Sequence, residues 1–235
     1  MTKLRTGFIV AGVVLASAAL WLAAAFYGLP WKEKAVAGKL EAHLEKKYEK
    51  DFVLKESYFN FKDGKYGGSF YPKDDPSLAF YADEGYGEYK YADDYPGVVW
   101  SRQLKEELEP EAKKAFPHMK TIQIDFVRSE NVDMVKGPAI PHYSQADAEL
   151  FVRVELEGDF SGSKEQWQAI AQFIRSAQSR SAVMEVSFNF VEKKSPTEAL
   201  VMCPMKNTAV ITNGEQAQKK CSIARFDAET TMLID

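Results

Sequence analysis

The pattern of hydrophobic positions begins with one long apolar segment. No charged residue interrupts the chain from Gly7 to Gly28, and Pro30 closes the run. A helix needs about 20 apolar residues to cross the hydrocarbon of a bilayer, whereas a cleavable signal usually carries about 7 to 15. Residues 7–28 therefore predict a single-pass transmembrane helix that remains attached to the chain as a signal-anchor.

Residues beside this segment predict its orientation. Lys3 and Arg5 precede it and favour a cytoplasmic N-terminus. Tyr27 and Trp31 follow it, at the level where amphipathic aromatic side chains favour the lipid headgroups. We expect residues 1–31 to form a cytoplasmic start and an anchor in the cell membrane, with the rest of the chain extracytoplasmic.

Two features leave alternatives open. Ala23, Ala24 and Ala25 match the small-residue pattern of a cleavage site, and cleavage there would release the remaining chain as a secreted protein. Lys32 and Lys34 follow the apolar run closely and reduce the charge asymmetry that orients it.

Behind the anchor, the pattern predicts a first domain over residues 32–118. It starts with an amphipathic helix whose apolar residues recur at every fourth position, namely Val36, Leu40, Leu44 and Tyr48. The β-rich segments 51–61 and 66–72 then flank Asp63-Gly64, which is a hairpin turn signal. A hairpin packed on the helix is expected.

The stretch YADEGYGEYKYADDYPGVVW, residues 81–100, completes this domain. Alternation predicts strands over 77–83 and 88–91, joined by a loop with two glycines. Asp93 or Asp94 can then cap a helix. This helix has Pro96 in its first turn and an i, i+4 stripe of Trp100, Leu104 and Leu108.

A second domain is predicted over residues 119–235, because regular alternation starts near Met119. Its three half-buried strands cover 122–126, 150–156 and 184–190. Ser163 and Gln166 form a capping box for an intervening helix with the apolar side Trp167, Ile170, Ile174 and Ala177. The predicted class is α+β: a transmembrane helix followed by two small domains, each an antiparallel sheet covered by helices.

Cys203 and Cys221 are the only cysteines, and a chain that faces an oxidising exterior favours a disulfide between them. A sequential three-stranded meander would separate the first and third strands by about 9.6 Å, too far for a bridge. Capping boxes at Ser195 with Glu198 and at Thr212 with Glu215 instead predict two short helices that end at the cysteines.

Composition and motifs narrow the function classes. The net charge is -4 and Lys and Arg are scattered, so the basic patch of nucleic-acid binding is missing and no nucleic-acid partner is expected. The three histidines are far apart in sequence, and no phosphate-binding glycine loop, nucleophile elbow or zinc motif occurs. We predict no metal site and no cofactor.

Two groups of residues are candidate contact or catalytic positions. Tyr86, Tyr89 and Tyr91 lie on the acidic hairpin, where tyrosines could contact a glycan or a cationic peptide. The structural alternative is that Tyr89 and Tyr91 pack across the sheet on the helix of Val36 and Leu40. The long loop 129–148 carries a local polar group for acid and base roles, namely His142, Tyr143 and Asp147.

The segments LEKKYEKDFVLKESYF (44–59) and DDYPGVVWSRQLKEEL (93–108), with the short basic start and the apolar helix, resemble the YfjL-like proteins of Bacillus and its relatives. This family has no established activity. The resemblance implies a membrane-tethered extracytoplasmic protein and carries over no catalytic residue.

The leading hypothesis is therefore a non-enzymatic, membrane-anchored module that binds an envelope protein or glycan. Its motivation is an anchor, residues 7–28, joined to folded domains without a catalytic motif. The alternative is a cell-envelope hydrolase or transferase whose site lies in the loop 137–147.

Overall fold

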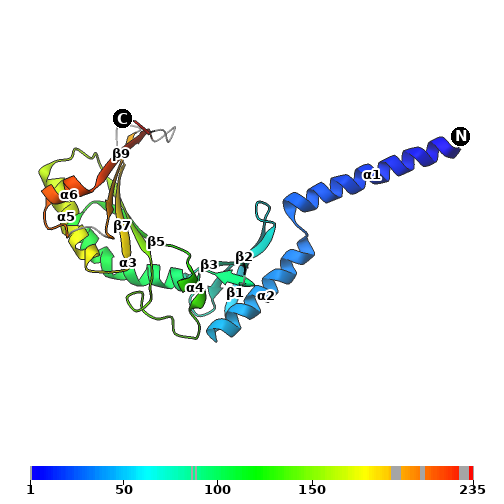
Figure 1. Ribbon diagram of the computed structural model, residues 1–235, viewed down its shortest axis with the longest axis horizontal. Helices are drawn as coiled ribbons and strands as arrows, with labels where there is room; N and C mark the ends of the chain where they lie inside the picture. The colour runs from blue at the N-terminus through cyan, green and yellow to red at the C-terminus, as the bar shows by residue number, and fades with distance from the viewer. Residues whose placement is uncertain are drawn as a thin grey trace. The chain divides into compact units, whose positions relative to one another are not determined.

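The computed structural model describes residues 2–85, 87, 89–191, 197–206, 210–227 and 233–234. It contains an N-terminal apolar helix and two α+β units, shown as a ribbon in Figure 1. The first unit is Met1–Tyr95 with Lys136–Ala139, and the second is Pro96–Val135 with Ile140–Asp235. The predicted boundary before residue 119 differs from this one, because the helix that starts at Tyr95 buries its apolar stripe in the second unit.

The first unit opens with two consecutive helices. Helix α1 (Thr2–Tyr27) contains the apolar segment, and α2 (Pro30–Tyr48) follows after Gly28 and Leu29. Pro30 is tolerated in the first turn of α2 because that position has no intrahelical donor bond to lose. The predicted stripe of α2 is confirmed, since all of its members are buried: Val36, Leu40, Leu44 and Tyr48.

A four-stranded antiparallel sheet lies against α2 in the order β1-β2-β3-β4. Its strands are β1 (Phe52–Asn60), β2 (Lys65–Pro72), β3 (Phe80–Glu84) and β4 (Tyr91–Asp93). The predicted hairpin is present, with Asn60 paired to Lys65 and Gly64 in the turn at φ 67°. The predicted strand 88–91 is displaced, because the pairing with β3 uses residues 91–93.

An aromatic cluster forms the centre of the first unit. It consists of four buried rings, and the centroids of contacting rings lie 4.9–6.0 Å apart. The four residues are Tyr48, Phe52, Phe80 and Tyr95. Edge-to-face arrangements of this kind are favoured by the quadrupoles of the rings. The apolar positions predicted on alternate residues of β3, Phe80 and Ala82, face this core.

One carboxylate is buried beside these rings. Asp93 is 1% exposed, accepts a hydrogen bond of 2.7 Å from the Tyr48 hydroxyl, and forms a 2.8 Å ion pair with Lys47. Its Oδ1 also accepts from the backbone N–H of Tyr95 at 3.2 Å, at the start of the next helix. Asp93 thus connects the end of α2, strand β4 and the beginning of that helix.

The second unit contains a six-stranded sheet in the order β10-β9-β8-β7-β6-β5. The strands are β5 (Met119–Phe126), β6 (Leu150–Glu157), β7 (Val183–Val191), β8 (Thr197–Pro204), β9 (Ser222–Asp227) and β10 (Leu233–Ile234). Its pairs are antiparallel except β6 with β7, which is parallel. Helix α5 crosses over between β6 and β7, and a crossover of this kind returns the chain in the same direction.

The helices of the second unit are α3 (Tyr95–Ala115), α4 (Glu130–Met134), α5 (Lys164–Gln178) and α6 (Gly214–Lys220). The apolar stripes of α3 and α5 share one buried cluster with the inward side chains of β6, β7 and β8. The predicted members of both stripes are confirmed as buried, from Trp100 on α3 to Ala177 on α5.

The prediction of a helix from Ser195 to Cys203 is wrong for its described part. Residues 197–204 form β8, whose alternate residues Ala199, Val201 and Cys203 are fully buried. Apolar residues at every second position favour a strand over the helix that a capping signal suggests. Ser195 and Pro196 themselves lie outside the described residues.

Cys203 and Cys221 form a disulfide with their Cα atoms 4.3 Å apart, as the sequence favours. The geometric route to it differs from the predicted one. Strands β8 and β9 are direct neighbours and Met202 pairs with Ser222, so the two cysteines are the next residues along this ladder. The described residues of the connecting segment, 205–206 and 210–221, contain α6 and no strand between β8 and β9.

We expect Asp93→Ala to destabilise the first unit by about 3–5 kcal/mol, because it removes the buried carboxylate that pairs with the partly buried Lys47 and accepts from the Tyr48 hydroxyl. Hydrogen exchange of β1–β4 peptides in the full-length chain in detergent should accelerate about a hundredfold or more. Asp51→Asn, which removes an exposed carboxylate paired with Lys73, is the matched control and should change exchange little. Equal exchange in the two variants would contradict a structural role for Asp93.

Replacing both cysteines by alanine should lower the stability of the second unit by about 3 kcal/mol, because the bond closes a loop of 18 residues in the unfolded chain. Hydrogen exchange of peptides from β8 and β9, recorded at increasing urea concentrations, gives the urea midpoint at which this region unfolds. Peptides of the first unit serve as the internal control. An unchanged midpoint for β8 and β9 would show that the bond contributes nothing to stability.

Candidate functional site

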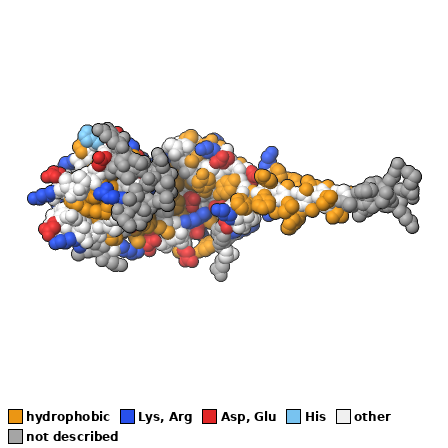
Figure 2. Space-filling view, turned by 90° about the horizontal axis from the view of Figure 1, so that it is seen from above, with side chains coloured by type: hydrophobic (Ala, Val, Ile, Leu, Met, Phe, Trp, Pro, Cys, Tyr) orange, Lys and Arg blue, Asp and Glu red, His pale blue; other side chains and the backbone are white. Residues whose placement is uncertain are grey.

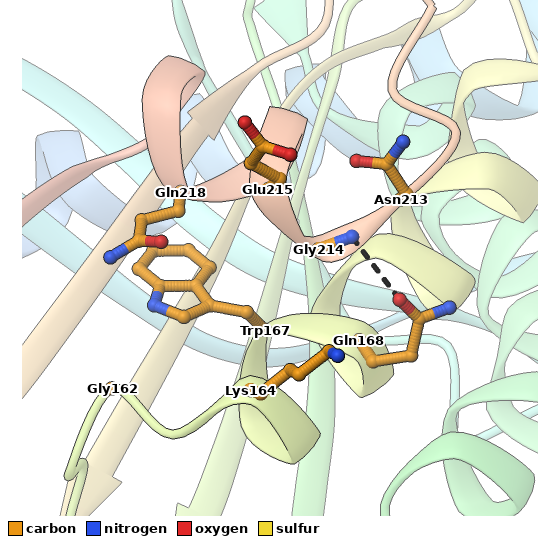
Figure 3. A pocket seen from close by; sticks show the side chains of 8 residues that line it. All are labelled: Gly162, Lys164, Trp167, Gln168, Asn213, Gly214, Glu215 and Gln218. Carbon is orange, nitrogen blue, oxygen red and sulfur yellow. Dashed lines mark hydrogen bonds between the residues drawn. The ribbon is translucent and has the colours of Figure 1, made fainter.

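A hollow of about 430 Å³ lies where the starts of α5 and α6 meet (Figure 3). Its walls come from two segments that are far apart in sequence, 162–168 and 213–218. Both segments are helix starts, so backbone amides and capping side chains gather there. The residues that line it are Gly162, Lys164, Trp167, Gln168, Asn213, Gly214, Glu215 and Gln218.

Each helix start is fixed by a side-chain cap. The Ser163 side chain accepts a hydrogen bond from the backbone N–H of Gln166, which confirms Ser163 as the cap, and the Gln166 side chain accepts from the N–H groups of Ser161 and Gly162. The Asn213 side chain caps α6 in the same way, by accepting from the N–H of Gln216 at 3.0 Å. The cap is therefore Asn213 rather than the predicted Thr212, one residue earlier.

Close approach of the two helices depends on Gly214. A Cβ at this position would lie 3.0 Å from the backbone of Trp167 and Gln168, so a larger residue would push the helices apart. The backbone N–H of Gly214 also donates to the Gln168 side-chain oxygen at 3.2 Å, the bond drawn in Figure 3. Gly214 therefore allows the starts of the two helices to lie in direct contact.

The chemistry of the hollow is polar and nearly neutral. The Trp167 indole is 3% exposed and contributes to its floor, while amide side chains from Gln168, Asn213 and Gln218 stand around it (Figure 3). The Glu215 carboxylate is paired with Lys219 at 2.7 Å, and this hydrogen bond lowers the pKa of Glu215. Amides offer both donors and acceptors, which suits a hydroxyl-rich ligand.

A second polar group forms around the loop that sequence analysis selected. The Tyr143 hydroxyl donates to Glu107 at 2.7 Å, and the His142 Nε2 lies 3.2 Å from the other oxygen of the same carboxylate. The Arg180 guanidinium pairs with Glu107 at 2.9 Å and with Glu111 at 3.4 Å. The structure therefore brings His142 and Tyr143 together, with partners from α3 and from the end of α5.

Asp147, the third residue of the predicted loop group, lies elsewhere. Its carbonyl and carboxylate oxygens accept hydrogen bonds from the Asn131 side chain at 3.1 and 3.4 Å. It therefore joins the loop to α4 and takes no part in the group around Glu107.

The environment of Glu107 sets the protonation of this group. Partial burial raises the pKa of Glu107, but hydrogen bonds from Arg180 and Tyr143 outweigh it and leave this pKa below the ordinary 4.5. Burial, followed by the hydrogen bond to Glu107, raises the pKa of Tyr143 to about 12. The group is thus a carboxylate, a guanidinium and a neutral phenol at neutral pH.

Of the three predicted tyrosine contacts, the structure describes Tyr89 and Tyr91. Tyr86 lies outside the described residues, and Tyr89 is exposed. Tyr91 is half-buried against the His43 ring of α2, with centroids 5.1 Å apart, as the strand-packing alternative expects. Burial and the charge of Lys47 lower the pKa of His43 in this contact.

Within the described part of the chain, no group of three or more His, Cys, Asp or Glu side chains has the spacing of a metal site. Sequence analysis missed the hollow, although it identified both of its capping segments. The signal was present as amide residues at exposed positions on two helix starts, but their meeting depends on the fold.

Glu107→Gln should lower the stability of the second unit at pH 7. A carboxyl group with a lowered pKa in the folded state stabilises above its ordinary value of 4.5, and this contribution is lost as the pH falls through the folded pKa. The difference between the variant and the parent chain should therefore shrink below about pH 4.5. Thermal unfolding across this pH range in detergent measures it.

The matched control is Glu106→Gln, which changes an exposed residue of the same helix. It should leave the pH dependence as it is in the parent chain. A parallel offset of the Glu107→Gln curve at every pH would contradict the assigned role of the carboxylate.

No protein-family model and no curated protein matches the chain. Among solved structures, a DUF5037 family protein from Ruminococcus gnavus is similar at 11% identity and a TM-score of 0.39. The match covers 85% of this chain and 94% of that chain. A likeness at this level carries no argument about activity, so the function is argued from the chain's own residues.

Proposed function

We propose that this protein is a single-pass membrane protein whose folded part lies outside the cytoplasm and binds a cell-envelope glycan without catalysis. The observation that carries the proposal is the uncovered apolar surface of α1. The hollow between α5 and α6 and the disulfide provide its further support.

Helix α1 is long and apolar enough to cross a membrane, by its length and composition. From Gly12 onward, its large apolar side chains are mostly exposed, including Leu15 at 71% and Trp21 at 72%. Figure 2 shows hydrophobic side chains along the described part of this helix. Exposure of one such side chain to water costs about 1.5–3 kcal/mol relative to burial, so a bilayer is the environment that satisfies the helix.

The disulfide supports an extracytoplasmic location. Bonds of this kind persist in oxidising compartments and are rare where the cytosol keeps thiols reduced. Cys203 is fully buried and bonded to Cys221 in the second unit. Lys3 and Arg5 on the other side of the apolar segment favour the matching orientation.

The hollow supports a neutral, hydroxyl-rich ligand. Its volume of about 430 Å³ is in the range of small-ligand sites, and its amide side chains can donate to and accept from sugar hydroxyls. The Trp167 indole lines the hollow but is only 3% exposed, so a sugar would be contacted chiefly by the amide side chains. A glycan therefore fits better than a charged peptide.

One observation favours a second candidate, a hydrolase or transferase centred on the loop 137–147. His142 and Glu107 are 3.2 Å apart and both about 40% exposed, as an acid and base pair would require. However, the Glu107 oxygens are already engaged by Tyr143 and Arg180. A carboxylate held this way is better suited to fixing the loop on α3 than to proton transfer.

The resemblance to YfjL-like proteins remains a prediction. It implies the same membrane-tethered location and offers no catalytic residue, so it is compatible with the binding proposal.

The proposal is tested by measuring both the membrane location of the chain and its binding to glycan. The full-length chain should stay in the membrane fraction through alkaline extraction and should keep its N-terminus. Protease added to intact cells whose outer membrane surface is accessible should digest the folded part. Purified in detergent, it should co-sediment with insoluble cell-wall glycan. Gln218→Ala should weaken this binding about two- to tenfold, the usual effect of one lost hydrogen bond.

Gln123→Ala, at an exposed glutamine on β5, is the matched control and should bind as the parent chain does. Equal weakening by both variants would reject the hollow as the glycan site. Release of a soluble chain that begins at Phe26 would reject the anchor. Turnover of the glycan that disappears in His142→Gln would replace the binding proposal by the enzymatic one.

A further inference from the structure

The junction between α1 and α2 is built against the β1–β2 hairpin. The backbone N–H of Leu29 donates to the Tyr66 hydroxyl at 2.9 Å. Gly28 has φ 70°, and a Cβ at this position would lie 2.7 Å from the Phe59 ring. Only glycine fits both the left-handed backbone and the close approach. The chain therefore leaves α1 through a fixed turn on the hairpin.

Two side-chain contacts hold the first turn of α2 to the same hairpin. The Ser57 hydroxyl on β1 donates to Glu33 at 2.5 Å. The Lys32 ammonium lies 4.6 Å from the centroid of the Tyr66 ring on β2. With Leu29 and Gly28, these contacts attach both sides of the junction to β1 and β2.

The tip of the hairpin lies beside the end of α1. The rings of Phe61, at the tip, and Phe26, in the last turn of α1, have centroids 6.1 Å apart. Both side chains remain more than half exposed, at 55% and 58%. Neighbouring Lys62, Tyr27 and Trp31 are also exposed. We call Tyr27, Trp31, Phe61 and Lys62 the hairpin-tip patch.

The length of α1 gives the depth of this patch. Phe26 is 19 residues after Gly7, the first residue of the uncharged segment, and at 1.5 Å per residue this corresponds to about 29 Å. The hydrocarbon core of a bilayer is about 30 Å thick. A helix that enters the hydrocarbon at Gly7 therefore leaves it at about Phe26, and Phe61 lies at the same level.

We propose that the hairpin-tip patch inserts into the lipid interface of the bilayer that α1 spans. Tyr27 and Trp31 match the aromatic belt of membrane proteins, Phe61 adds apolar contact from the folded sheet, and Lys62 can reach lipid phosphates. The inference rests on the proposed anchor and deepens it, because the first unit then sits directly on the membrane.

The bilayer is the occupant of this patch because the patch continues the exposed apolar surface of α1. Phe26 and Phe61 belong to one contact, so the environment that covers the first also covers the second. A separate protein partner would have to bind at the point where α1 enters the lipid.

Spin labels on the full-length chain in phosphatidylcholine and phosphatidylglycerol vesicles test the inference. The labels are placed one at a time through Leu15→Cys, Phe61→Cys and Lys73→Cys; all three side chains are exposed, so none opens the core. Collision rates with oxygen, which enters lipid, and with a water-soluble nickel complex report the depth of each label. The parent chain, whose cysteines are bonded, gives the labelling background.

The ratio of oxygen to nickel collisions should be severalfold higher at Phe61 and Leu15 than at Lys73. A high ratio at Leu15 with a Phe61 value equal to that of Lys73 would overturn the hairpin inference and leave the anchor intact. A low ratio at Leu15 would overturn the proposed anchor itself, and the hairpin inference with it.

Discussion

The structure of this protein depends first on the constraint that apolar surface has to be removed from water. Both folded units satisfy it internally, because helices cover one face of each sheet and bury the side chains between them. Helix α1 does not, since side chains such as Leu15 and Trp21 are mostly exposed. The same physical rule therefore stabilises the cores of the units and supports the proposed placement of α1 in lipid.

Two carboxylates, the buried Asp93 and the partly exposed Glu107, connect elements within the units. Asp93 joins α2, β4 and the start of α3 through Lys47, Tyr48 and the Tyr95 amide. Glu107 joins α3, the loop at Tyr143 and the end of α5 through Arg180. Such groups resemble catalytic clusters in composition, but their charges and hydrogen bonds are largely satisfied within the fold. The hollow at α5 and α6 differs, because its amide side chains line open space, although those of Gln168 and Asn213 also accept hydrogen bonds from backbone N–H groups.

The two proposals concern different ends of the chain. The hollow is formed within the second unit and would select a ligand through amide hydrogen bonds. The hairpin-tip patch belongs to the first unit and continues the apolar surface of α1. In the proposed function, the hollow would select the ligand and the hairpin-tip patch would hold the first unit at the membrane surface.

The sequence by itself determined the elements whose signal repeats locally: the apolar segment, the stripes of α2, α3 and α5, the Asp63-Gly64 turn and the cap at Ser163. Local periodicity suffices because neighbouring residues share one helix or strand. Tertiary structure decided three other features: the assignment of α3 to the second unit, the parallel pairing of β6 with β7, and the formation of strand β8. So were the meetings of Glu107 with Arg180, 73 residues apart, and of Gly214 with Gln168. Such contacts depend on the order of strands in the sheet, which no local pattern contains.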